Sequence, residues 1–140
     1  MAIAGTESVE ILAPLQRVRA VLLDVEAYPG WMPAYRKATV LERDQQGRPR
    51  RVEFEAERYV TIRFTLEYEH SADTISYRRI AGGGRQNEGT YRLEAHGAST
   101  RATLEYTLDP GAPVPDFIIR PGIKKSVAED LAALKRRAER

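Results

Sequence analysis

The sequence contains no cysteine, which excludes disulfide bonds, thiolate catalysis and cysteine-ligated metal. Histidine is scarce as well. The two present, His70 and His96, each lie at the end of a predicted strand, and their separation does not match the spacing of a metal-binding pair. We therefore expect neither a metal nor another cofactor.

Long apolar runs are also missing. No stretch of about 18 apolar residues occurs and residues 1–5 lack a basic start, so we expect neither a transmembrane segment nor a signal peptide. Lys and Arg total 22 against 20 Asp and Glu, a net charge of only +2. This near balance argues against stable nucleic-acid binding. The lack of cysteine fits a reducing compartment, and we expect a cytoplasmic location.

The length of 140 residues fits one domain, residues 1–140, without a linker, repeat or low-complexity segment. A first strand is predicted at residues 6–11. Pro14 then opens a helix whose Leu15, Val18, Leu22 and Val25 share one face at helical spacing, and a short second helix or turn follows at residues 28–33. Another strand is predicted at residues 37–44.

From residue 52 onward, apolar and polar residues alternate with a period of two, as half-buried strands require. Short turns between these segments, such as Gly82–Gly84, predict consecutive antiparallel hairpins with one buried face. The residues expected to point inward are Phe54, Phe64, Leu66, Tyr68, Tyr77, Tyr91, Leu104 and Tyr106.

The C-terminal stretch predicts the one long helix. Its apolar positions recur at steps of three and four and share one face: Ile123, Val127, Leu131, Leu134 and Ala138. Pro121 either starts this helix or kinks one that begins near Asp116; we favour the kinked helix, because Phe117 and Ile119 need burial. The order of elements is α+β, and the sheet is predicted to wrap around the helix.

Three segments carry a resemblance to a known family. The pattern Asp-x-x-x-Tyr-Pro-x-Trp at Asp24–Trp31 resembles the polyketide cyclase/dehydrase and Coq10-like branch of the START (SRPBCC) superfamily. Residues 88–93 resemble its Gly-aromatic strand, and residues 131–139 resemble its final helix. The resemblance covers the whole chain and implies the helix-grip fold. In that fold a curved antiparallel sheet of about seven strands surrounds a long C-terminal helix, two short helices follow the first strand, and an apolar cavity lies between sheet and helix.

Apolar walls with a few polar groups are typical of small-molecule sites. Arg79 shares strand parity with Tyr77, so it either points inward and needs an anionic or carbonyl partner, or frays into the glycine turn. The predicted ligand-binding residues are Phe54, Phe64, Leu66, Tyr68, Tyr77, Arg79, Tyr91, Leu104, Tyr106, Phe117 and Ile119.

The resemblance implies binding, or transport, of a small hydrophobic or amphipathic ligand such as a lipid, an isoprenoid or a polyketide. The first alternative is an aromatic polyketide cyclase/dehydrase that uses Arg79 and the inward tyrosines as donors and proton carriers. No nucleophile–base pair is recognisable, so we assign no catalytic residue. The second alternative is a protein- or ribosome-interaction module that uses the basic end at Lys135–Arg137. Whether the chain forms a homodimer is left open.

Overall fold

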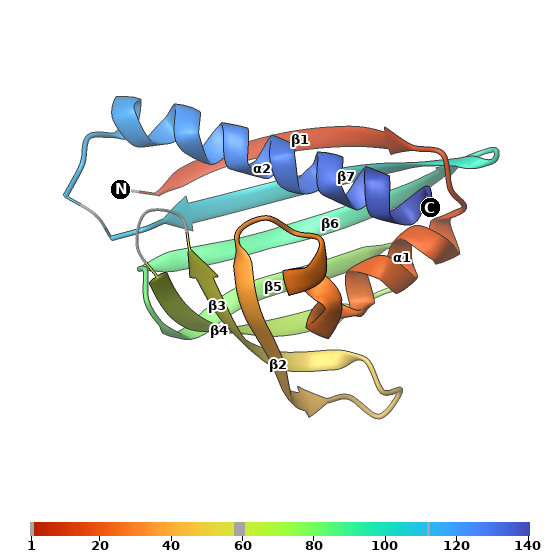
Figure 1. Ribbon diagram of the computed structural model, residues 1–140, viewed down its shortest axis with the longest axis horizontal. Helices are drawn as coiled ribbons and strands as arrows, with labels where there is room; N and C mark the ends of the chain where they lie inside the picture. Colours follow the sequence, from red (N-terminus) through yellow and green to blue (C-terminus); the bar gives the residue numbers. More distant parts are fainter. Residues whose placement is uncertain (1, 58–60, 112) are drawn as a thin grey trace.

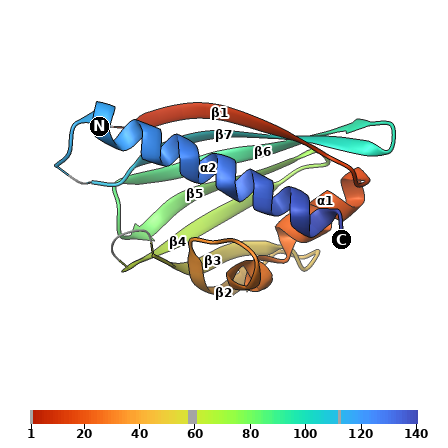
Figure 2. The same cartoon turned by 45° about the horizontal axis from the view of Figure 1, so that its top comes forward.

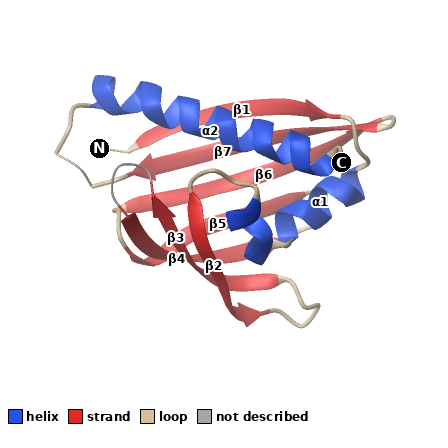
Figure 3. Ribbon diagram, in the orientation of Figure 1, coloured by secondary structure: helices blue, strands red, loops and turns tan. Residues whose placement is uncertain are grey.

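The computed structural model describes residues 2–57, 61–111 and 113–140. Figure 1 shows the path of the chain, and Figure 3 separates its helices from its strands. The elements are, in chain order, β1 (Ile3–Ile11), α1 (Leu15–Leu23), the 3₁₀ helix η1 (Val25–Gly30), β2 (Tyr35–Arg43), β3 (Pro49–Glu57), β4 (Thr61–His70), β5 (Thr74–Gly82), β6 (Gln86–His96), β7 (Ser99–Asp109) and α2 (Asp116–Ala138).

The strands form one sheet in the order β1-β7-β6-β5-β4-β3-β2, and every neighbouring pair is antiparallel. The strands from β2 to β7 are consecutive neighbours, as the short turns predicted. The segment with α1 and η1 carries the chain from the edge strand β1 to the other edge, β2. The sheet is curved, and α2 lies over the same face as α1 (Figures 1 and 2). The predicted helix-grip architecture is confirmed.

Helix α2 begins at Asp116, directly after Pro115, and continues through Pro121 to Ala138. The helix start predicted at Asp116 is therefore confirmed. The apolar stripe faces the sheet: Leu131 and Leu134 are buried, because the helical period places them on the inner side. The backbone of α2 comes closest to β1 and α1. The helix thus rests on one edge of the sheet and on α1, and it spans the central strands from there.

The link from β1 to β2 is held by buried hydrogen bonds. The Thr100 hydroxyl donates to the carbonyl oxygen of Ala13 at 2.8 Å, and the Tyr28 hydroxyl donates to that of Leu22 at 2.5 Å. The spacing had suggested that Val18 and Val25 lie in the same helix. Helix α1 ends at Leu23, however, so Val25 lies in η1. Both residues are nevertheless buried in the same core.

Gly82 illustrates why the β5–β6 connection needs glycine. Its φ is +92°, which side-chain-bearing residues rarely adopt, and a Cβ there would collide with the carbonyl oxygen of Arg63 on β4. The predicted hairpin role of Gly82–Gly84 is confirmed, since β5 ends at Gly82 and β6 begins at Gln86.

Candidate functional site

The inner face of the sheet holds the candidate site. Alternation along the strands directs one side chain in two toward α2. Of the predicted site residues, six are buried there: Phe54, Phe64, Leu66, Tyr68, Leu104 and Tyr106. Tyr77, Arg79, Tyr91 and Ile119 are half-buried. The half-buried residues lie where α2 covers the sheet, so their partial exposure indicates that solvent can reach them there.

Aromatic rings occupy two neighbouring regions of this face. In the first, Phe54 packs against Tyr35, Phe64 and Tyr28, with ring centroids 4.8, 5.8 and 6.1 Å apart, respectively. Ring contacts of this kind add to the stability that burial provides. Sequence reasoning missed Tyr28 and Tyr35 as members of the site. Tyr28 lies within the Asp24–Trp31 pattern, so that motif contained the signal.

The second aromatic region crosses strands β4, β5 and β6, and we call its members Tyr68, Tyr77 and Tyr91 the aromatic row. Tyr68 and Tyr77 are register partners on β4 and β5 with ring centroids 6.0 Å apart, and Tyr91 on β6 lies 6.2 Å from Tyr77. Tyr77 is directly opposite Gly89, and a Cβ on Gly89 would come within 2.6 Å of the Tyr77 hydroxyl oxygen. The ring therefore lies flat over the glycine, close to the sheet, because no side chain occupies that place. Tyr106 covers Gly5 in the same way.

The tyrosines of this row keep their protons. Burial, followed by the nearby phenols and the carboxylate of Asp130, raises the pKa of Tyr77 and Tyr91 far above the ordinary phenol range. Burial also raises the pKa of Tyr68. Each is therefore a neutral hydroxyl that can donate one hydrogen bond.

Within the described part of the chain, the hydroxyls of Tyr68, Tyr77 and Tyr91 form no hydrogen bond to another residue. None of the three hydroxyls is fully enclosed either. Among the described residues, the only side-chain N and O atoms that are both enclosed and without a hydrogen bond are His70 Nδ1 and Arg79 Nε. The three hydroxyl oxygens thus keep some exposure to solvent and are free to donate to a bound molecule or to water.

The carboxylate of Asp130 on α2 acts on the tyrosines electrostatically. Asp130 is half-buried, and its negative charge contributes to raising the pKa of Tyr28, Tyr77 and Tyr91. Sequence reasoning did not assign it to the site. Its position, three residues after Val127 and one before Leu131, places a charged group beside the apolar stripe, and this was the available signal.

Arg79 combines the two alternatives that its sequence position left open. Its guanidinium donates to the carbonyl oxygens of Gly82 at 3.1 Å and Arg85 at 2.7 Å, so it holds the β5–β6 turn together. Its Nε is enclosed and has no partner within the described residues. Because carbonyl oxygens of the turn engage the guanidinium, Arg79 is a structural residue at the border of the site.

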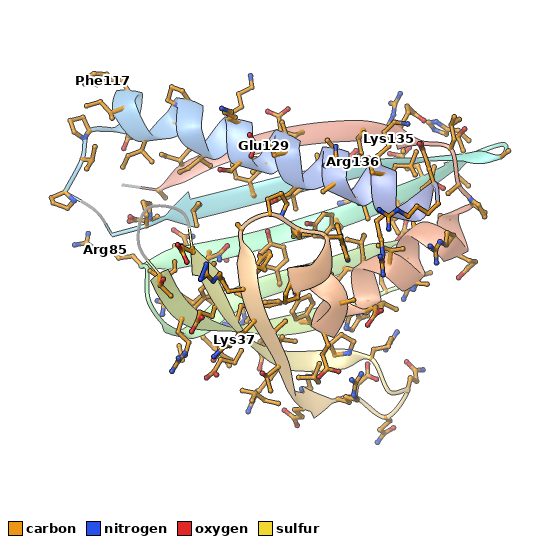
Figure 4. All side chains as sticks on the ribbon, in the orientation of Figure 1. Lys37, Arg85, Phe117, Glu129, Lys135 and Arg136 are labelled. Atoms are coloured by element: carbon orange, nitrogen blue, oxygen red, sulfur yellow. The ribbon has the colours of Figure 1, made fainter. Side chains whose placement is uncertain are left out.

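Phe117 does not belong to the inner face. Its side chain lies at the free end of α2 (Figure 4) and is 77% exposed. Ile119, in contrast, packs against the core. Two residues that are two positions apart lie on opposite sides of an α-helix. The expectation that both face inward was wrong for this reason.

The neutral phenols lead to a titration prediction. We expect some of the seven tyrosines to stay protonated when the folded protein is taken above pH 10, while the unfolded chain ionises all of them near pH 10. The stabilising contribution of these groups is therefore complete below about pH 10 and is lost at higher pH, as the unfolded chain releases the protons. Ultraviolet absorbance at 295 nm measures the ionisation. Ionisation of all seven phenols near pH 10 with native circular dichroism would contradict it.

His70 marks the end of the aromatic row, where its ring stacks on Tyr68 at 6.0 Å. Its Nε2 lies 2.6 Å from the carbonyl oxygen of Pro49, and its Nδ1 is enclosed without a partner among the described residues. Burial lowers the pKa of His70, Arg48 and Arg19 lower it further, and the Pro49 hydrogen bond and Asp44 oppose them.

A pH prediction follows from this environment. The folded protein binds a proton at His70 less readily than the unfolded chain, so stability is present above about pH 6.5 and is lost as the pH falls below it. Urea unfolding at several pH values should show a smaller loss in His70→Phe than in the wild type. The exposed His96→Phe is the matched control. An acid loss equal in His70→Phe and wild type would contradict this role.

A hollow of about 640 Å³ lies on the opposite, outer face of the sheet. It is open to solvent and is bordered by polar side chains of β1 and β4–β7, among them Glu67, Glu69, Ser76, Thr90 and Glu105. Glu67 is engaged by Arg51 and Arg78, and Ser76 and Thr90 bond to each other at 3.0 Å. Since Glu67, Ser76 and Thr90 already have partners, the inner face is the stronger candidate.

Two further observations concern the described residues alone. No group of three or more His, Asp or Glu side chains among them could hold a metal ion. None of their helices is long and apolar enough to cross a membrane.

A curved seven-stranded antiparallel sheet that holds a C-terminal helix over an aromatic inner face defines a helix-grip protein. The family model described as polyketide cyclase/dehydrase and lipid transport matches residues 2–139. The chain therefore belongs to this family, as the Asp24–Trp31 pattern indicated.

Solved structures agree on the fold. A START superfamily protein from Mycobacterium smegmatis has a TM-score of 0.90 at 22% identity, with 97% of each chain covered. The Zhui aromatase/cyclase from a Streptomyces species has a TM-score of 0.86 at 21% identity, covering 100% of this chain and 95% of its own. A STAR-related lipid transfer protein from Xanthomonas axonopodis has a TM-score of 0.74 at 16% identity, covering 98% and 86%. No curated protein matches the sequence.

Proposed function

We propose that this protein binds a small hydrophobic or amphipathic molecule between the inner face of the sheet and α2. The observation that carries the proposal is the set of neutral hydroxyls of Tyr68, Tyr77 and Tyr91, which reach accessible space without a hydrogen-bond partner among the described residues. A buried phenol is stable when a ligand or water accepts its hydrogen bond.

The surroundings of these hydroxyls select the kind of ligand. Phe54, Phe64 and Leu66 offer apolar walls, and the tyrosine rings offer flat faces. Neutral O–H groups donate hydrogen bonds, so the matching ligand is a largely apolar molecule with oxygen acceptors. Lipids, isoprenoids and aromatic polyketides all have this chemistry. The family description and the folds of the lipid transfer protein and of the aromatase/cyclase support the same range.

The binding test compares two flat probes of similar size, flavone, which carries a carbonyl acceptor, and 2-phenylnaphthalene, which carries none. Both should bind near one-to-one and raise the melting temperature, because a ligand that binds the folded state alone stabilises it, by about 2.7 kcal/mol at 100 times its Kd. Tyr77→Phe should lower the affinity for flavone by about fivefold, as expected for the loss of one hydrogen bond. Its affinity for 2-phenylnaphthalene should be unchanged.

The outcomes separate the possibilities. If neither probe binds to the wild type, the interior is not a ligand site. If both bind and Leu66→Trp, which fills the inner face, leaves them bound while the protein stays folded, the site lies elsewhere. Native mass spectrometry of the purified protein, searching for a co-purified molecule, identifies the natural ligand class.

A second candidate function, cyclisation of an aromatic polyketide, is supported by Asp130. A carboxylate beside the phenols of Tyr77 and Tyr91 could accept a proton from a bound substrate while a phenol stabilises the resulting enolate. Asp130→Asn should then abolish turnover of a polyketone and leave probe binding intact. If Asp130→Asn reduces turnover and probe binding equally, Asp130 has a structural role and not a catalytic one.

Two further expectations belong to this proposal: residues 1–140 act as one domain in the cytoplasm, and nucleic acid is not bound stably. Whether the protein forms a homodimer is left to experiment. The net charge of +2 and the absence of cysteine support the two expectations. Light scattering determines the oligomeric state.

A further inference from the structure

The free end of α2 exposes apolar side chains. Phe117 is 77% exposed and Ile118 56%, and Val114, in the segment just before the helix, is 39% exposed. We call these three residues the apolar tip. Figure 4 shows Phe117 at the end of the molecule that is remote from the C-terminus. More than half of the Phe117 and Ile118 side chains is left uncovered, and adjoining exposed apolar side chains are typical of an interaction surface.

Basic side chains flank the apolar tip. Arg120 and Lys124 follow it on α2, and both are exposed. Arg85 lies at the same end of the molecule (Figure 4), and its Cγ packs 3.4 Å from the place of a Cβ on Gly111, in the segment that leads into α2. Two acidic groups are also near: Asp116, which pairs with Arg120 at 4.0 Å, and Asp109, which accepts from the Gly111 N–H at 2.9 Å.

The spacing along α2 matches the layers of a bilayer surface. A helix rises about 1.5 Å per residue, so Arg120 lies about 4.5 Å and Lys124 about 10 Å behind Phe117 along the axis. The interfacial region of a leaflet is about 5–7 Å thick. A helix end that enters with Phe117 and Ile118 first therefore brings Arg120 to the phosphates, and the long side chain of Lys124 can extend toward them from just above.

A second copy of the chain fits this surface poorly. Two-fold pairing through the tip would bring Arg85, Arg120 and Lys124 of one copy toward the same residues of the other, and like charges repel. Three exposed side chains also bury far less than the roughly 1,000 Å² that a stable protein interface requires. An anionic surface satisfies both the charge and the shape.

We propose that the apolar tip docks the protein on anionic membranes, with Phe117 and Ile118 in the outer acyl region and Arg85, Arg120 and Lys124 on lipid phosphates. Apolar insertion combined with basic contacts is the established way in which peripheral segments bind reversibly to a bilayer surface. The proposal is independent of whether the inner face binds a ligand.

The test measures flotation of the whole protein with vesicles of phosphatidylcholine alone, or with about 30 mol % phosphatidylglycerol added, at low salt. We expect binding to the anionic vesicles that decreases with salt. Phe117→Ser combined with Ile118→Ser should lower the partition coefficient by at least about tenfold. Arg85→Gln and Lys124→Gln should each lower it by about fivefold on anionic vesicles.

Leu12→Ser is the matched control, because Leu12 is 73% exposed in the β1–α1 link, at the other end of the molecule. It should bind as the wild type does, and circular dichroism melts confirm that every variant is folded. The proposal is overturned if the wild type does not float with anionic vesicles, or if the Phe117/Ile118 variant binds unchanged. It is also overturned if Leu12→Ser loses as much binding, or if the wild type is a dimer that the Phe117/Ile118 substitutions convert to a monomer.

Discussion

Leu134→Ala is expected to lower the free energy of unfolding by about 2–5 kcal/mol, the range for a large core residue truncated in place. Leu134 is 1% exposed on the inner side of α2, where the helix grips the sheet. Removing three carbons there leaves a cavity that the surrounding strands cannot readily fill, because contacts with β1 and α1 hold α2 in place. Urea unfolding followed by circular dichroism measures the change.

Leu12→Ala is the matched control, since it removes the same atoms from an exposed leucine. It should change the free energy of unfolding by no more than about 0.5 kcal/mol. If Leu134→Ala lowers the free energy of unfolding as little as Leu12→Ala does, α2 is not docked through its apolar stripe. Leu131→Ala, at the neighbouring buried position, should fall in the same range as Leu134→Ala.

Gly89→Ala is expected to reduce flavone binding by at least about tenfold, or about 1.4 kcal/mol, without unfolding the protein. The added Cβ would meet the Tyr77 hydroxyl oxygen at 2.6 Å, which is too close for non-bonded atoms. The end of a tyrosine side chain moves more easily than the backbone, so the ring should swing away from the sheet and into the space where the ligand is proposed to lie.

Two further variants test this explanation. Gly30→Ala is the matched control, since a Cβ at Gly30 meets nothing within 4 Å; flavone binding should be unchanged. In Gly89→Ala/Tyr77→Ala the displaced ring is gone, so part of the affinity for 2-phenylnaphthalene should return. If Gly89→Ala binds flavone as the wild type does, the space over Gly89 is not part of the binding site.

The sequence by itself determined the architecture. Period-two alternation from residue 52 onward, short glycine-containing turns and a helical stripe from Ile123 to Ala138 admit few arrangements other than a meander packed on one helix. Alternation also placed Phe54, Leu66 and Tyr77 on the inner face, because the side-chain period of a strand leaves two choices and burial selects one. The family followed from the short pattern at Asp24–Trp31.

The composition of the site depended on contacts between distant segments, which local periodicity does not contain. Tyr28 and Asp130 join the aromatic face because the β1–β2 connection and α2 both cross the sheet there. Arg79 became a turn residue because the carbonyl oxygens of Gly82 and Arg85 lie within its reach.

Phe117 lies outside because residues two apart on a helix face opposite ways, and the first turn of α2 carries it to the free end of the helix. Patterns along the chain therefore decided which elements form and which face each buries. The tertiary structure alone decided which side chains share a space, since that depends on where separate elements cross.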